Sequence, residues 1–261
     1  MIYFDSHFHF PSIQEKDPSY SLPSSLIGLE IAIEAGDLES RIKSIEKYRN
    51  DNIFLSSGSG PWVLEKDGFI SVENEISEIE KEIEEYGCDA IGEAGFDRYW
   101  NYGTMEEQKE LFYSQAELAK KYNRALIIHS RDADHELEES IQHLGDRVIF
   151  HCFSSGKELM YKALDKGAFI SFSANISFKG SEKQREAAKL CPIDRLLYET
   201  DSPYLAPRDK GGRINTPERT EFTLSYLSEL RGEDRDNIKE MAISNFYHVL
   251  GYRKSKVKRD F

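Results

Sequence analysis

The chain lacks the features that mark membrane, secreted and disulfide-bonded proteins. Its 261 residues contain no run of about 18 apolar side chains, so we expect no transmembrane helix. Residues 1–5 have neither a basic segment nor a long apolar segment, so we expect no signal peptide. The three cysteines are odd in number and widely spaced, which argues against disulfides and for a reducing cytoplasm. One of them, Cys152, follows His151, and strand alternation predicts a structural thiol that points away from that histidine.

Positive charge is also scarce, because 34 lysines and arginines face 47 acidic residues, for a net charge of −13. A protein that binds nucleic acid through many phosphate contacts is usually basic on at least one face. If this chain acts on a phosphate ester, metal ions must therefore supply much of the positive charge. A basic cluster within residues 253–259 is interpreted as a solvated chain end. The acidic surface is compatible with a monomer, which we expect.

Eight short apolar runs predict eight strands. They are rich in β-branched and aromatic residues and are nearly all apolar, as is typical of strands that are buried on both faces. The runs lie at residues 2–4, 29–33, 53–55, 90–91, 125–128, 148–150, 169–172 and 196–198.

Amphipathic stretches between these runs predict helices, for example over residues 75–86, 158–166 and 184–190. Thr104 and Glu107 have the spacing of a capping box at the start of another helix. Residues 10–28 carry three prolines and several serines, so we expect an irregular loop there. Repeated strand–helix units predict a parallel sheet, and eight of them predict a closed (β/α)8 TIM barrel, for which about 250 residues are typical. We therefore predict a single TIM-barrel hydrolase domain over residues 1–261.

Candidate metal ligands lie at the ends of these predicted strands. Two of them form a His-Phe-His pair after the first strand, and residues i and i+2 of an extended chain point to the same side. In a barrel the carboxyl ends of all strands meet at one mouth, where barrel active sites lie. The six candidates are His7, His9, Glu93, His129, His151 and Asp201.

Each of these residues alone has a simpler explanation. A histidine after a strand can be structural, Glu93 can cap a helix, and Asp201 can shape a turn before Pro203. The joint placement of four of the seven histidines and two carboxylates at strand ends favours a metal site.

The number and chemistry of these ligands favour two ions. Imidazole and carboxylate ligands suit zinc, manganese, iron, cobalt or nickel better than calcium. Six protein ligands are too many for one catalytic ion, which must keep an open position. They suit two ions about 3.5–4 Å apart with a bridging carboxylate, an arrangement that activates water and stabilises a leaving oxygen. We therefore expect two divalent ions, with zinc, manganese or magnesium as the candidates.

Longer motifs surround these ligands. They are Asp5-Ser6-His7-Phe8-His9, Ile91-Gly92-Glu93-Ala94-Gly95-Phe96-Asp97, Ile128-His129-Ser130-Arg131-Asp132-Ala133, His151-Cys152-Phe153-Ser154, Glu199-Thr200-Asp201-Ser202-Pro203-Tyr204-Leu205-Ala206-Pro207 and Arg213-Ile214-Asn215-Thr216-Pro217, with Gln108 and Gln115 in a following helix. With these motifs the chain resembles the TatD family of metal-dependent deoxyribonucleases, within the amidohydrolase superfamily. The resemblance extends from residue 1 to residue 251.

The resemblance implies a role for each ligand. His7, His9 and Asp201 would hold one ion, and His129 and His151 would hold the other. Glu93 would bridge the two ions. Asp201 would also orient the nucleophilic water and accept its proton, so Asp201 and Glu93 are the expected catalytic residues.

Two arginines are candidates for binding the substrate. Guanidinium groups fit phosphate oxygens, so Arg131 and Arg213 are expected to bind a substrate phosphate, although either could instead form a structural ion pair.

Two segments depart from the family's pattern. The family usually has Leu-Asp after the His-x-His pair, whereas this chain has Phe10-Pro11. The family also usually has Gly-x-His-Pro after the third strand, whereas this chain has Gly58-Ser59-Gly60-Pro61 followed by Trp62, so that histidine is absent. Neither change affects a proposed ligand, but both change the wall of the pocket and hence bear on the substrate.

Three functions remain open at this point. The first is a TatD-type deoxyribonuclease that cleaves phosphodiester bonds at DNA ends. The second is a metal-dependent hydrolase of another ester or amide, such as a small metabolite or an aminoacyl ester, which the acidic charge and the absent histidine favour slightly. The third is a barrel that binds metal only for a regulatory or scaffolding role, which is disfavoured because every expected ligand is present.

Overall fold

The structure is a computed structural model, and it describes residues 1–48, 50–100, 102–207 and 214–252. Eight parallel strands form one sheet in the order in which they occur in the sequence. They are β1 (Tyr3–Phe8), β2 (Leu26–Glu30), β3 (Ile53–Ser57), β4 (Ala90–Asp97), β5 (Ala125–Arg131), β6 (Val148–Phe150), β7 (Phe169–Phe172) and β8 (Leu196–Tyr198). The predicted eight-stranded barrel is confirmed.

The barrel closes beyond the carboxyl ends of β1 and β8. A parallel bridge joins Phe8 to Ser202, and the His9 N–H donates to the Ser202 carbonyl over 2.8 Å. The Asp201 N–H in turn donates to the His7 carbonyl over 3.0 Å. Main-chain hydrogen bonds of barrel closure therefore fix three of the predicted ligands.

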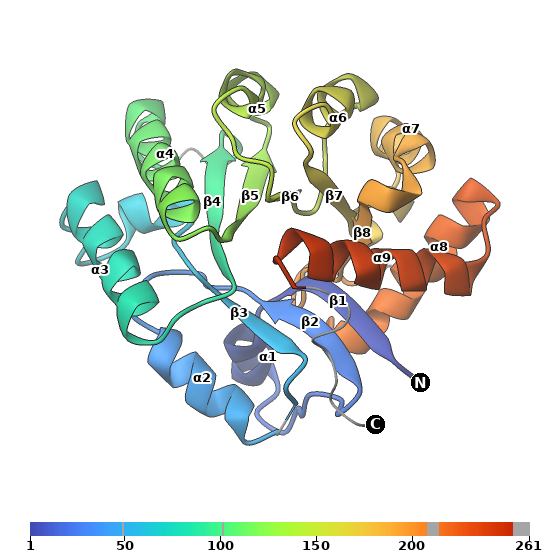
Figure 1. The fold of residues 1–261 in the computed structure, drawn as a ribbon, viewed down its shortest axis with the longest axis horizontal. Coiled ribbons are helices and arrows are strands. Elements are labelled where there is room, and N and C mark those ends of the chain that lie inside the picture. Colours follow the sequence, from blue (N-terminus) through green and yellow to red (C-terminus); the bar gives the residue numbers. More distant parts are fainter. Residues whose placement is uncertain (49, 101, 208–213, 253–261) are drawn as a thin grey trace.

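Helices surround the strands on the outside (Figure 1). None of them, among the residues that the structure describes, combines the length and the apolar character needed to cross a membrane. They are α1 (Phe10–Lys16), α2 (Leu38–Glu46), α3 (Val72–Glu85), α4 (Met105–Lys121), α5 (Asp134–Ile141), α6 (Lys157–Leu164), α7 (Glu182–Leu190), α8 (Thr220–Arg231) and α9 (Arg235–Val249).

The start of α4 illustrates how local sequence places a helix. The Thr104 N–H donates to the Glu107 carboxylate over 2.8 Å, and the Glu107 N–H donates to the Thr104 hydroxyl over 3.2 Å. This predicted capping box is confirmed, and it satisfies amides that would otherwise lack a partner in the first turn. Phe112 then lies buried in the main core, and Leu111 packs in a separate cluster with Val63 and Val72.

The core consists of the apolar strands and the inner faces of the helices. All residues of β2 and β4 are buried, and so are the phenylalanines Phe4, Phe96 and Phe150. Burying one such side chain contributes about 1.5–3 kcal/mol. The strand ends that carry the candidate ligands therefore rest on a rigid scaffold.

The structure corrects the prediction for residues 10–28. Residues 10–16 form the helix α1 rather than a loop, because Pro11 lies in its first turn, where an amide N–H is not needed. The second strand spans Leu26–Glu30 rather than residues 29–33. Ile31 lies beyond it, where its carbonyl is free to face His9.

Candidate metal centre

The six predicted ligands gather at one mouth of the barrel. Three lie within strands β1, β4 and β5, and the other three follow β1, β6 and β8 closely. A cavity of about 730 Å³ opens above them, and every predicted ligand except the fully buried His7 lines it. The six are His7, His9, Glu93, His129, His151 and Asp201.

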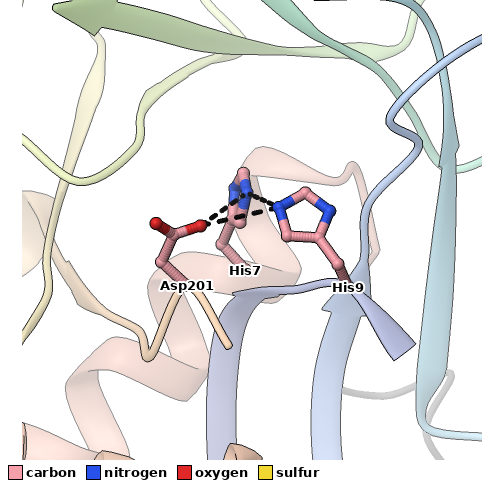
Figure 2. Close-up of side chains that lie close together, drawn as sticks. All are labelled: His7, His9 and Asp201. Carbon is pink, nitrogen blue, oxygen red and sulfur yellow. Dashed lines mark hydrogen bonds and ion pairs between the residues drawn. The ribbon is translucent and has the colours of Figure 1, made fainter. Parts of the chain in front are cut away.

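Four atoms form a first group, and Figure 2 shows three of its four residues, His7, His9 and Asp201. The Nε2 atoms of His7 and His9 lie 3.2 Å apart. Glu93 Oε1 is 3.6 Å from His7 Nε2 and 3.4 Å from His9 Nε2, and Asp201 Oδ1 is 3.6 Å and 3.5 Å from the same two atoms. A tetrahedron of ligands around an ion with bonds of about 2.0–2.2 Å has edges of about 3.3–3.6 Å. The five separations given above lie close to these edges and fit a small divalent ion.

Three atoms form a second group on the other side of Glu93. Glu93 Oε2 is 2.8 Å from His151 Nε2 and 3.2 Å from His129 Nδ1, and these two nitrogens are 3.4 Å apart. The two oxygens of one carboxylate thus face different groups. The groups are contiguous, because the His7 and His151 rings stack with centroids 3.9 Å apart.

The chemistry of the donors also fits divalent cations. Buried carboxylates and imidazoles need a partner of opposite charge or a metal to offset the loss of hydration. Nitrogen and oxygen donors at these separations suit zinc or manganese, with room for further ligands on the cavity side.

Hydrogen bonds behind the histidines determine which ring nitrogen faces each group. His9 Nδ1 is 3.1 Å from the Ile31 carbonyl, so its Nε2 is turned inward. His129 Nε2 lies 3.4 Å from Asp97 Oδ2, and His151 Nδ1 lies 3.3 Å from Glu199 Oε1. Such partners orient a metal-binding imidazole and raise its basicity.

Asp97 and Glu199 were not identified as functional from the sequence, although both lie within the motifs quoted above. Gln108 accepts the Asp97 N–H over 2.9 Å and donates to its carbonyl over 3.1 Å, which holds Asp97 in place. Their positions at or just after the ends of barrel strands, where the ligands also gather, are the signal that would have identified them.

Proton affinities at the site are strongly shifted. Burial raises the pKa of Glu93, but His151 and His129 outweigh it, so that the pKa lies well below its ordinary value. Burial lowers the pKa of His151, but Glu93 and Glu199 outweigh it, so that this pKa lies well above 6.5. Carboxylate and imidazolium charges thus compensate each other, and a metal ion would replace the protons.

The two arginines have different outcomes. Arg131 ends β5 and lines the cavity, and its guanidinium carbon lies 3.9 Å from the Tyr99 ring centroid. Arg213 lies outside the described residues. Within the same Arg-x-Asn-x-Pro motif, Asn215 Nδ2 donates to the carbonyls of Thr200 and Tyr204 over 3.0 Å and 2.6 Å. Asn215 therefore holds the turn that carries Asp201.

An indole fills the place of the absent histidine. A side chain on Gly60 would begin only 2.1 Å from the Trp62 ring, so the indole lies where that side chain would be. The Trp62 ring meets His129 edge to face with centroids 5.5 Å apart, and its N–H donates to the Ile33 carbonyl over 2.8 Å. The wall of the cavity beside His129 is therefore aromatic.

The prediction for Cys152 rested on strand alternation, which does not apply at this position. The thiol is free, but Cys152 lines the same cavity as His151. β6 ends at Phe150, and Cys152 has φ +43°, so strand alternation no longer applies. Its N–H donates to Glu199 over 2.6 Å, and its sulfur contacts Ser173.

Known proteins with similar sequences and structures place the chain in a family. The family described as TatD related DNase matches residues 4–251. The uncharacterized metal-dependent hydrolase YcfH of Escherichia coli K12 is 32% identical over 216 residues, which cover 80% of this chain and 78% of that protein. An uncharacterized metal-dependent hydrolase of Mycoplasma genitalium is 30% identical over 95% of this chain and all of its own length.

A solved structure agrees with this placement. The crystal structure of YJJV, a TatD homologue from Escherichia coli K12, has a TM-score of 0.82 and 25% identity, and it covers 95% of this chain and 97% of its own. A dihydroorotase at 15% identity and a TM-score of 0.65 shares the fold. The chain therefore belongs to the TatD-related DNase family and is a TatD-type metal-dependent hydrolase.

Proposed function

We propose that this hydrolase cleaves phosphodiester bonds at DNA ends, with two divalent ions at the barrel mouth. The observation that carries the proposal is the position of Glu93, whose two oxygens face two separate sets of ligand atoms. A carboxylate shared in this way is the usual bridge of a two-ion site.

The residues divide between the two ions. His7, His9 and Asp201 would hold one, His129 and His151 would hold the other, and Glu93 would be shared. When bound, such a pair of ions supplies an activated water and neutralises charge on the reacting phosphate. Zinc, manganese or magnesium suits this role.

Asp201 accepts the proton of the attacking water. Its Oδ1 faces the rings of His7 and His9, and Figure 2 shows its other oxygen turned away from them. The side chain is 14% exposed, and Asp201 lines the cavity. A carboxylate oxygen that lies at the edge of the ligand group and is open to the cavity can act as a general base toward a water there.

Arg131 binds a phosphate of the substrate. It borders the cavity two residues beyond His129, at the end of the same strand. In a chain with a net charge of −13, one guanidinium together with the metal ions provides the local attraction that a polyanion needs. Arg213 is proposed for the same task.

A second candidate function is the hydrolysis of a carboxylic ester or amide. The aromatic wall that Trp62 forms beside His129 favours it, because an apolar wall suits an uncharged group better than a phosphate. The same ion pair could serve carbonyl and phosphoryl centres.

Metal analysis and a substrate panel test the proposal. Purified protein loaded with manganese, magnesium or zinc is expected to hold two ions per chain and to release nucleotides from single-stranded or duplex DNA. Fewer than one ion per chain would refute the two-ion centre. Turnover of carboxylic esters without release of nucleotides would select the second function.

A substitution tests the role of Asp201. Asp201→Asn is expected to lower kcat by about 10²–10⁴-fold, as is typical for loss of a general base. Asp194→Asn is the matched control, because Asp194 precedes β8 and so lies at the opposite end of the barrel. Full activity of Asp201→Asn would contradict the proposed role.

A further inference from the structure

Two large aromatic side chains lie exposed beside the cavity. Tyr99 and Trp100 follow β4 after Arg98 and are 56% and 58% exposed, with ring centroids 5.1 Å apart and ring planes at 84°. Trp100 lines the cavity. Adjacent exposed rings of this size at the mouth of a site are unusual in a packed protein and indicate a binding surface.

Several hydrogen bonds fix the turn that carries these rings. The Trp100 N–H donates to Asp97 Oδ1 over 2.8 Å, and the Arg98 N–H donates to the Arg131 carbonyl over 2.9 Å. Arg98 also forms an ion pair with Glu136. The rings are thus held in position before any ligand binds, which lowers the entropy cost of binding.

A third member of this surface is Arg131. Its guanidinium carbon lies 3.9 Å from the centroid of the Tyr99 ring and 5.7 Å from that of Trp100. Among the described residues, Arg131 has no carboxylate at ion-pair distance, whereas Arg41 and Arg98 are both paired. Stacking orients the guanidinium and leaves its N–H donors available to an anion.

Asp97 connects this surface to the metal centre. While its Oδ1 accepts the Trp100 N–H, its Oδ2 lies 3.4 Å from His129 Nε2. A single carboxylate therefore contacts both the turn that carries the rings and a proposed metal ligand.

We propose that Tyr99, Trp100 and Arg131 form a nucleotide subsite, in which a base stacks on the Trp100 ring and the phosphate of the same nucleotide binds Arg131, which Tyr99 orients. This inference rests on the phosphodiester function proposed above. The nucleotide that the subsite binds is the one next to the cleaved bond. An aromatic face stacks on any base, so the subsite favours a nucleotide without selecting its sequence.

The test compares oligonucleotides that differ by one base. The metal-loaded enzyme cleaves a short single-stranded DNA, and matched strands carry an abasic residue at each of the last three nucleotides in turn. At one position the missing base is expected to raise KM about ten-fold or more, with little change in kcat, because stacking is lost. Trp100→Ala is expected to raise KM similarly on the normal strand and to show no further effect of the missing base.

Tyr161→Ala is the matched control, because Tyr161 is an aromatic residue on α6 with 45% exposure. It is expected to keep the full difference between normal and abasic strands. A variant of Arg131 tests the charge: Arg131→Gln is expected to lower the slope of log KM against log salt by about one, as for loss of one phosphate contact.

The outcomes separate this inference from the proposed function. If the wild type cleaves no oligonucleotide, the proposed function itself fails. If it cleaves normal and abasic strands with equal KM at all three positions, only the subsite is refuted. The subsite is also refuted if Trp100→Ala retains the full response to the missing base.

Discussion

The two ligand groups that share Glu93 are held in different ways. The first group, His7, His9 and Asp201, depends on the main chain, because the hydrogen bonds of barrel closure join these residues. His9 is oriented by a backbone carbonyl, and His7 Nδ1 has no hydrogen-bond partner among the residues that the structure describes. The geometry of the first group therefore follows from the closure of the barrel.

The second group depends on side chains. His129 and His151 are oriented by the carboxylates of Asp97 and Glu199, and the His129 side chain is 17% exposed. The imidazoles of this group are therefore more basic and more accessible than those of the first. The comparison teaches that single substitutions should affect the second group selectively, while the first should withstand all but the loss of its own ligands.

The largest effect on metal binding and activity is expected from Glu93→Gln, which removes the carboxylate that both groups share. An amide cannot place a negative oxygen on each side, so both ions should be lost and activity should fall at least about 10²-fold. Metal analysis and kcat measure the result. Two ions per chain in this variant would contradict the shared role of Glu93.

The next largest effects are expected from Asp97→Asn and Glu199→Gln. Each removes a charge behind one histidine, and loss of such a partner typically lowers metal affinity or activity by about 10–100-fold. Chelator titration should show one ion lost early and the other retained with wild-type affinity. An equal loss of affinity for both ions would contradict the distinction between the groups. Asp194→Asn is the control and is expected to keep the affinity for both ions.

The metal-free protein is expected to lose stability as the pH rises. The His151 pKa is raised above 6.5 by Glu93 and Glu199 against burial, so its contribution is present below pH 6.5 and is lost as pH rises through the folded value. The Glu93 pKa lies well below 4.5, so its contribution is present above pH 4.5 and is lost only as pH falls through the lowered value. Both contributions are present between pH 4.5 and 6.5.

Thermal unfolding of chelated protein measures this effect. The free energy of unfolding should fall above pH 6.5, by about 1.4 kcal/mol for each unit of the pKa difference. His7 acts in the opposite direction, since burial and His151 lower its pKa. Metal affinity should rise over the same range, because binding displaces protons. A Tm that stays level from pH 6.5 to 9 would contradict the predicted linkage.

The smallest effect is expected from Cys152→Ser. This residue holds Glu199 through its backbone N–H, which the substitution keeps, and its sulfur contacts Ser173 and Asn175. Stability should change by about 1 kcal/mol or less, with both ions retained. Loss of the second ion would show that the thiol itself supports that group.

The existence and order of the strands could be predicted because each depends on a local pattern, although β1, β4 and β5 extend further than their apolar runs. Apolar runs indicate buried strands, and Glu93, His129 and His151 end or directly follow such runs. The capping box at Thr104 was predictable for the same reason. The helix α1 was not, because several prolines in one stretch concealed the fact that Pro11 occupies a first turn.

Contacts between distant segments could not be predicted in this way. Asp97 acts on a histidine of the neighbouring strand, 32 residues away in sequence, and Glu199 acts on a histidine that follows a strand two positions away in the sheet, 48 residues away in sequence. The Trp62 indole occupies the place of the absent histidine only because Gly60 has no side chain that would collide with it. The single-domain organisation, the monomeric state and the cytoplasmic location stay predictions.

The sequence by itself determined the barrel and the six candidate ligands, because apolar runs indicate buried strands and the carboxyl ends of parallel strands in a barrel converge. Only the tertiary structure decided how those ligands divide. The division follows from which ring nitrogen each histidine turns inward, and hydrogen-bond partners from other strands set that choice.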